Sequence, residues 1–551
     1  MDQHLHPPSR LRLRLPKLVA HWLRILELIF VHGQVENAVE ILGNPTSDPA
    51  LRQQAFDFVN QLRATENAWQ VCTGLFTRDP RSSDLVRIAC LEIINYSIHD
   101  HRLDASTLVY LKDTLFNYIR RAYGPDSASA PDPSSVQNKL VQTLTYLFVF
   151  LYQDGWQGFL DDFIALTGPQ HQNSDGVVLY LRVLGSIHDE IADMMLSRNS
   201  VDAKRNADLK DQVRAQDMAK IAQSWKDILA LYVGQNDAII DMVLKVMAKW
   251  VSWMDIQLVL NQDILGLLLP IVGRSSDSGK EDAVRDTAIN TLTEIVGKRM
   301  KTSDKMELIS FLNLREIVAR LVASPALTDL KNTAKYDTDL ADAVAKLVNV
   351  VMSDVVKALE ESEAGSELRS RADGHLSDFL PFLLRFFGDD YDEVCTAVIS
   401  SLTDLLAVLR KIHGQSPNYD EMLPPILNAI ILKMRYDSTS SWGDEGDQTD
   451  EAEFQELRKR LQILQKSIEA VDQNLFVEVL SNLVGDKFQT LDQQGSQMDW
   501  RDLDLALHEM ELFGELALSN QGLAGKKQPS AVATERLTIM MKKMVESGAN
   551  S

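Results

Sequence analysis

The sequence predicts an all-α fold, an α-solenoid superhelix of HEAT- or armadillo-like antiparallel helix pairs. Turn-forming residues are scarce, because the 26 glycines and 17 prolines make up about 8% of the chain against roughly 12% in average proteins. Apolar residues recur with the helical period, and strand patterns are almost absent. After Gln34 we count roughly ten or eleven pairs of helices with their turns. The chain length per pair is then close to the 40 to 47 residues of HEAT and armadillo repeats. We therefore expect one continuous array, in which each pair buries its apolar stripe against its neighbours.

The elements follow from the start of the chain. Residues 1–33 form an extension of uncertain status, in which 11–30 could be a basic amphipathic helix. A targeting or membrane-surface helix, an additional helix without a separate role, and an extension added by gene prediction all remain open. Short polar breaks then separate the helices, as at 44–49, 124–135 and 273–279. Three later stretches show apolar residues at steps of three or four: Val136, Leu140, Leu144, Leu147, Leu151; Val284, Ala288, Leu292, Ile295; and Leu340, Val344, Leu347, Val351, Val355.

Charge and composition exclude several classes of protein. The formal net charge of −22 repels nucleic acid and anionic lipid, so binding to either requires a locally basic surface. The apolar runs are shorter than the roughly 20 residues that span a bilayer, so we do not expect a membrane protein. Cys72, Cys90 and Cys395 are far apart and form neither a disulfide framework nor a CxxC metal motif. This pattern indicates a reducing compartment.

No catalytic motif is present. The glycine spacings exclude the GxGxxG and GxxxxGK phosphate loops and the GxSxG nucleophile turn, and the histidines form no HExxH. We therefore predict a binding protein without catalytic residues, cofactor or metal.

Two kinds of charged segment are candidate binding sites. Residues 436–456 carry a local charge of −8 with no lysine or arginine, and such a segment attracts a basic partner. A solvated insert is the equal alternative, and Trp442 and Phe454 favour docking as exposed aromatic anchors. The acidic candidates are Asp444, Glu445, Asp447, Asp450, Glu451 and Glu453.

The basic candidates for an anionic partner have acids between them, so an ordinary mixed-charge helix face is the favoured alternative. They are Lys204, Arg205, Lys210 and Arg214, together with Lys298, Arg299 and Lys301. Trp250 and Trp253 lie on one face of an apolar helix, where core packing is favoured over base stacking.

Several runs resemble β-karyopherin nuclear transport receptors. Residues 48–55, DPALRQQA, are similar to the first repeats of this superfamily, and residues 249–256, KWVSWMDI, resemble the exportin-T family of tRNA export receptors. Residues 450–454, DEAEF, followed by Arg458 and Lys459, agree with that family. The resemblance covers most of the chain after Gln34. Residues 1–33 have no counterpart, and the C-terminal repeats of the family are expected to be missing, so the chain looks like the N-terminal part of a receptor.

The resemblance implies a carrier that binds tRNA cooperatively with Ran in its GTP form in the nucleus. It would cross the pore through nuclear pore proteins and release both ligands in the cytoplasm after Ran hydrolyses GTP, so this chain itself is not an enzyme. Ran-binding repeats are expected at 34–163 and further repeats at 164–551, with the acidic insert at 437–456 as our hypothesis for a second Ran contact. We also expect a monomer that shuttles between nucleus and cytoplasm. A protein-cargo karyopherin and a static HEAT-repeat scaffold remain alternatives.

Overall fold

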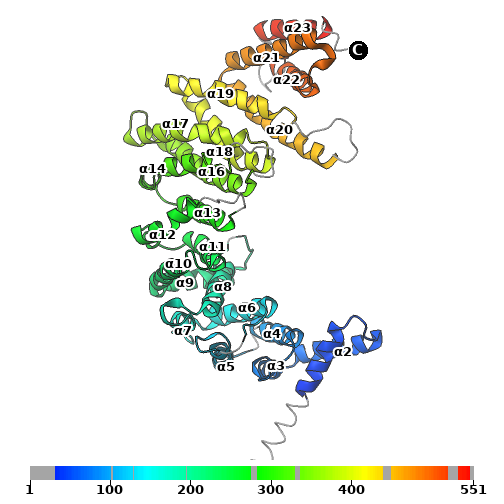
Figure 1. Ribbon diagram of the computed structural model, residues 1–551, viewed down its shortest axis with the longest axis vertical. Helices are drawn as coiled ribbons and strands as arrows, with labels where there is room; N and C mark the ends of the chain where they lie inside the picture. The colour runs from blue at the N-terminus through cyan, green and yellow to red at the C-terminus, as the bar shows by residue number, and fades with distance from the viewer. Residues whose placement is uncertain are drawn as a thin grey trace, which may run out of the picture. The chain divides into compact units, whose positions relative to one another are not determined.

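The structure, a computed structural model, describes residues 31–100, 103–127, 130–193, 195–274, 282–328, 336–437, 448–518 and 531–546. All regular elements within these ranges are helices, which confirms the predicted all-α class (Figure 1). The chain divides into two compact units, Met1–Leu268 and Leu269–Ser551, and the division falls within α12 (Gln262–Val272). The functional boundary expected at residue 163 is a separate matter and stays a prediction.

The first unit contains two layers of helices. Helices α2, α4, α6, α8 and α11 pack side by side as one layer, which we call the α4 layer, and each of the last four also packs against a helix outside it. The partners in these pairs are α3 with α4, α5 with α6, α7 with α8, and α10 with α11. Residues 31–43 are also helical. The bounds are α2 (Pro49–Ala64), α3 (Ala68–Thr77), α4 (Asp84–His99), α5 (Ala105–Tyr123), α6 (Ser134–Leu151), α7 (Phe159–Leu166), η1 (Pro169–His171), α8 (Ser174–Ile191), α9 (Ser200–Gln216), α10 (Met218–Tyr232), α11 (Asp237–Val251) and η2 (Ile256–Leu258).

The second unit repeats this arrangement. Helices α13, α16, α18 and α20 are successive neighbours, while α17 packs against α14, α15 and α19. The last three helices, α21 to α23, pack against one another. The bounds are α13 (Ala283–Gly297), α14 (Thr302–Phe311), α15 (Leu314–Val322), α16 (Thr338–Glu361), α17 (Glu367–Phe387), α18 (Asp392–Ile412), α19 (Pro417–Lys433), α20 (Gln448–Val471), α21 (Gln473–Gln494), η4 (Gly495–Gln497), α22 (Trp500–Leu518) and α23 (Ala531–Glu546).

The predicted helical stripes form the core of both units. In α6, Val136, Leu140, Leu144 and Leu147 are fully buried and Leu151 is 3% exposed. All the predicted apolar residues of α13 and α16 are also buried. Each buried side chain of this size contributes about 1.5–3 kcal/mol relative to its exposed state, so packing between helices dominates the stability.

Asp side chains begin many of the helices. Asp104 accepts a hydrogen bond from the backbone N–H of Thr107 at 2.8 Å, and Asp337 accepts one from that of Leu340 at 3.0 Å. These caps satisfy N–H groups that have no partner within the helix and fix where each helix begins.

Candidate macromolecule-binding surfaces

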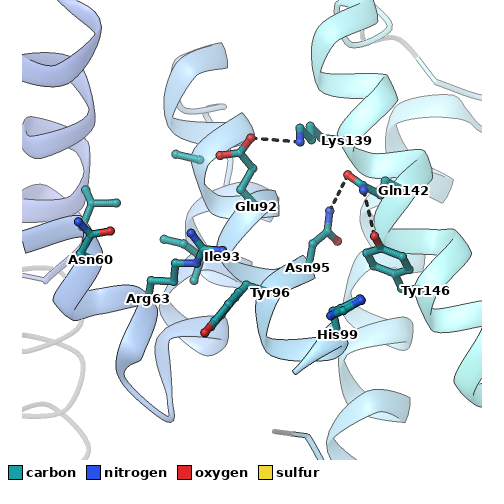
Figure 2. Close-up of a pocket in the computed structure, with 12 residues that line it drawn as sticks. Asn60, Arg63, Glu92, Ile93, Asn95, Tyr96, His99, Lys139, Gln142 and Tyr146 are labelled. Carbon is teal, nitrogen blue, oxygen red and sulfur yellow. Dashed lines mark hydrogen bonds and ion pairs between the residues drawn. The ribbon is translucent and has the colours of Figure 1, made fainter. Parts of the chain in front are cut away.

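A hollow of about 480 Å³ lies on the first unit between α2, α4 and α6, and we call it the α4 groove (Figure 2). On α4 the lining residues Glu92, Tyr96 and His99 follow one another at steps of four and three, which places them on one helical face. The full lining is Val59, Asn60, Arg63, Ala89, Glu92, Ile93, Asn95, Tyr96, His99, Lys139, Gln142 and Tyr146. Polar and aromatic side chains therefore dominate this surface.

Polar contacts connect the three helices across the groove. Lys139 Nζ lies 3.1 Å from Glu92 Oε1, which pairs α6 with α4. The Arg63 guanidinium of α2 lies 4.0 Å from the ring centroid of Tyr96, in cation–π geometry. Gln142 Nε2 donates to Tyr146 Oη at 3.1 Å within α6. Figure 2 shows the first and last of these contacts as dashed lines. The positive charges of Lys139 and Arg63 thus already have partners.

Asn95 is the exception in this groove. Its residue is 7% exposed, and its Oδ1 has no hydrogen-bond partner among the described residues. Its Nδ2 donates to Gln142 Oε1 at 3.4 Å, a long contact (Figure 2). An unsatisfied buried acceptor costs about 1–3 kcal/mol of desolvation, so the unpartnered Oδ1 lowers the stability of the folded state.

A buried ion pair anchors α4 beside the groove. Arg87 Nη1 lies 2.8 Å from Asp132 Oδ1, and the residues are 1% and 3% exposed. Tyr118 and Tyr123 donate their hydroxyls to Asp132 Oδ2 at 2.7 and 2.9 Å. Burial alone would raise the pKa of Asp132, but its contacts with Arg87 and the hydroxyls outweigh burial, and the pKa lies below its ordinary value. The network ties the segment before α6 to α4 and α5, and so fixes the groove walls.

The first predicted basic set lies on α9, and local acids neutralise half of it. Arg205 pairs with Asp202 at 2.9 Å, and Arg214 pairs with Asp211 at 2.5 Å. Lys204 is exposed and Lys210 is half-buried, and neither has an ion-pair partner among the described residues. The two arginines therefore behave as residues of an ordinary mixed-charge helix face. The two lysines form no such ion pair with a described residue and could contact an anionic partner.

The second predicted basic set lies in the connection between α13 and α14. Arg299 and Lys301 are exposed and form no ion pair within the described ranges. Lys298 is half-buried at the end of α13. The two basic sets belong to different units of the chain.

The acidic segment is partly helical. Asp444, Glu445, Asp447 and Trp442 lie outside the described residues. From Gln448 onward the backbone forms α20, so the expected insert at 437–456 ends in helix, because Glu and Ala favour helices and acids suit a helix N-terminus. Asp450 lies in this first turn, and Glu453 is exposed.

Two predicted contact residues of the acidic segment are already engaged within the fold. Glu451 accepts hydrogen bonds from Tyr436 Oη and Gln455 Nε2, both at 2.8 Å. Phe454 is half-buried, with its ring centroid 4.5 Å from that of Tyr436. Phe454 is therefore less exposed than expected, because its ring packs against Tyr436, and its role as a docking anchor stays a prediction.

Trp250 belongs to the core, as predicted. It is 1% exposed, its indole N–H donates to the Leu184 carbonyl at 3.0 Å, and its ring contacts Trp253 at a centroid distance of 4.7 Å. The three cysteines are buried and free. Among the described residues there is no group of three His, Cys, Asp or Glu side chains able to hold a metal ion. None of the described helices has both the length and the apolarity needed to cross a bilayer.

The predicted basic sets leave out other exposed cations, among them two on α20. Arg460 and Lys466 on α20 are exposed, and neither forms an ion pair with a described residue. Each of the two lies three residues from Ile463, which is 61% exposed, and residues three apart are neighbours on a helix surface. This spacing could have indicated the two cations from the sequence. Asn95 gave no such signal, because its missing partner is a consequence of helix packing.

Comparisons with known proteins agree with this architecture. The family model described as Exportin-T matches residues 366–551, and that of Exportin 1-like protein matches residues 133–292. Exportin-T of Podospora anserina is 62% identical over 516 residues, 94% of this chain and 51% of the relative. Exportin-T of Neurospora crassa is 58% identical over 521 residues, with 94% and 51% covered.

The chain spans about half the length of the curated relatives it matches. A solved structure of importin13 in its cytosolic state aligns with a TM-score of 0.54 at 12% identity, covering 80% of this chain and 49% of that one. This likeness concerns the fold, a helical solenoid, and confirms that part of the prediction. With two relatives of the same name at this identity over almost the whole chain, the chain belongs to the exportin-T family.

Proposed function

We propose that this chain is the part of a nuclear export receptor that binds tRNA together with Ran in its GTP form. The observation that carries the proposal is the 62% identity over 94% of the chain to an Exportin-T protein. The stacked helix layers support it, because such repeats offer long surfaces to macromolecules. Membership of a transport-receptor family also supports a role without catalysis.

Ran is assigned to the first repeats, residues 34–163, which include the α4 groove. The acidic residues at the start of α20 are the proposed second contact. Among the described acids there, we choose Glu453 as the candidate Ran contact because its side chain is exposed. Glu451 instead accepts hydrogen bonds from Tyr436 and Gln455. A basic surface on Ran would be attracted by such residues over roughly a Debye length, about 8 Å.

The tRNA contacts are assigned to cations that keep their charge. Of the predicted basic residues, Lys204 and Lys210 of the first unit and Arg299 and Lys301 of the second form no ion pair with a described residue. Phosphate contacts of this kind position RNA without reading its sequence, and double-stranded RNA is recognised mainly by shape. A chain with a net charge of −22 can bind RNA only where such local patches outweigh the repulsion.

Cooperation between the two ligands requires that each one favours the same conformation of the repeats. Coupling of this kind is typically about 1–3 kcal/mol, which is a change in affinity of roughly 5- to 150-fold. Shuttling between nucleus and cytoplasm, contact with nuclear pore proteins and a monomeric state belong to the same proposal. They can be followed by imaging a fluorescent fusion and by light scattering.

One binding experiment tests the proposal. Fluorescent tRNA is titrated with this chain, with and without Ran locked in its GTP form, and Ran binding is measured in parallel. tRNA binding that tightens at least fivefold with Ran-GTP supports the proposal. Ran binding without RNA binding would instead identify a protein-cargo carrier, and binding of neither would identify a scaffold; both results contradict the tRNA receptor.

A further inference from the structure

We infer that Ser416 is a phosphorylation site for a proline-directed serine/threonine protein kinase, with ATP as the phosphoryl donor. Among the 17 prolines of the chain, only Pro325 and Pro417 follow a serine or threonine. Both follow serine, so the chain offers a kinase of this class two Ser-Pro dipeptides, at 324–325 and 416–417. The environments of the two serines differ, and this difference selects Ser416.

The hydroxyl of Ser416 is unbonded and reaches solvent. Ser416 occupies the N-cap position of α19, where a serine commonly accepts a helix N–H, but its side chain makes no such hydrogen bond. Its Oγ has no other partner among the described residues. The residue is half-buried, yet this oxygen is not one of the buried polar atoms of the described chain. The atom that would accept the phosphoryl group is therefore free of contacts within the fold.

The backbone at Ser416 already has the shape of a kinase substrate. Residues 413–418, which we call the α18–α19 turn, are all exposed except Ser416 itself. Ser416 is extended, with φ −150° and ψ 137°, because a following proline disfavours the helical conformation. Protein kinases bind the residues around the acceptor hydroxyl in an extended form, so the turn needs little rearrangement at the acceptor.

Few contacts hold the α18–α19 turn closed. Pro417 is the first residue of α19, and the N–H groups of the first turn of a helix have no partner within it. Gly414 has a φ of 77°, a conformation that favours glycine and lets the chain bend before Ser416. His413 Nδ1 lies 2.9 Å from Asp420 Oδ1, and both side chains are more than a third exposed. Exposed pairs of this kind add little stability, so a kinase can open the turn without unfolding α18 or α19.

Ser324 has the same dipeptide in the opposite environment. Its Oγ is buried without a hydrogen-bond partner, so protein atoms cover it. Its N–H donates to the Leu321 carbonyl at 3.1 Å, and its carbonyl accepts from the Leu327 N–H at 3.0 Å. Leu321 and Leu327 are themselves buried, so exposing this hydroxyl requires the turn after α15 to leave the core. Ser324 is therefore an internal control that the folded chain should protect.

The reaction is an ordinary phosphoryl transfer. A bond forms between Ser416 Oγ and the γ-phosphorus of ATP, the bond from that phosphorus to the β,γ-bridging oxygen breaks, and ADP leaves. The hydroxyl proton passes to a carboxylate of the kinase. The product adds a charge of about −1.5 to −2 at the beginning of α19, where the helix dipole favours an anion. The fold can therefore hold the product.

The test uses the whole chain with a purified cyclin-dependent kinase and MgATP. Phosphate at each serine is quantified over time by peptide mapping with mass spectrometry, and we expect Ser416 to react at least tenfold faster than Ser324. Pro417→Ala should slow the reaction at Ser416 at least tenfold, because the kinase selects proline after the acceptor. The matched control Pro325→Ala should leave the rate at Ser416 unchanged. Both prolines are exposed, and circular dichroism checks that both variants keep the fold.

Twelve-residue synthetic peptides centred on Ser324 and on Ser416 show the reactivity of each sequence without the fold, and we expect both to be phosphorylated. Three results would overturn the inference. They are a chain in which Ser416 stays unmodified, a chain in which Ser324 reacts as fast as Ser416, and a Pro417→Ala variant that reacts as fast as wild type. These measurements need neither Ran nor tRNA, so their outcome is independent of the proposed receptor function.

Discussion

Glu509 of α22 is expected to make the contact between α20 and α22 sensitive to pH. Its residue is fully buried, and Oε2 accepts a hydrogen bond from Gln465 Nε2 at 2.6 Å. Glu509 Oε1 is also buried and lacks a hydrogen-bond partner among the described residues, so no hydrogen bond beyond that from the Gln465 amide compensates a charge on this carboxyl. Burial raises the pKa of Glu509 from 4.5 to about 7, and the Gln465 hydrogen bond and Arg458 oppose this shift only weakly.

The sign and size of the effect follow from this shift. Between pH 4.5 and about 7 the folded state binds a proton that the unfolded state does not, so stability falls as the pH rises through this window. A difference of about 2.5 pKa units corresponds to about 3 kcal/mol, lost by the time the pH has passed 7. The change Glu509→Gln keeps a neutral donor and acceptor beside Gln465, and should remove this pH dependence.

Hydrogen exchange read by mass spectrometry measures the local stability of α20 and α22. After correction for the intrinsic exchange rate, we expect protection of wild-type α20 and α22 to fall by roughly 150-fold between pH 4.5 and 8, and that of Glu509→Gln to stay constant. The exposed Glu511 on the same helix provides the control Glu511→Gln, which should follow wild type. Parallel curves for wild type and Glu509→Gln would refute the reasoning, because they would mean that Glu509 is ionised inside the fold.

The other predictions concern the buried pair and the charged surfaces. Asp132→Ala leaves Arg87 buried without its carboxylate and should cost about 3–5 kcal/mol in urea unfolding of the chain; a loss below about 1 kcal/mol would contradict the network. Lys204→Ala with Lys210→Ala should weaken tRNA binding and reduce its salt slope by about one unit per lost phosphate contact. The pair Arg205→Ala with Arg214→Ala should change the slope less, because Asp202 and Asp211 already neutralise these arginines; equal effects would refute the distinction. Glu453→Lys should weaken Ran-GTP binding and its salt dependence, measured by titration at two salt concentrations, and an unchanged affinity would leave α20 without a role in that contact.

The stripes of α6, α13 and α16 were predictable because a helix repeats every 3.6 residues, and one buried face leaves that period in the chain. The pairing of Arg205 with Asp202 also follows from local spacing, since residues three apart share a helix face. Glu509 left a partial signal, because it lies between Leu505 and Leu512 on an apolar stripe, at steps of four and three.

The tertiary structure decided what the sequence pattern left open. Asn95 reads as an ordinary polar residue of a helix, and only the packing of α6 against α4 removes it from water without giving Oδ1 a donor. Phe454 reads as a free aromatic residue, yet Tyr436 covers it from the other side of the acidic segment. The local pattern was sufficient to assign the helices and the apolar face of each, because these depend on neighbours within one or two turns. Which polar atoms find partners depends on side chains from helices tens of residues away, and no local period records their approach.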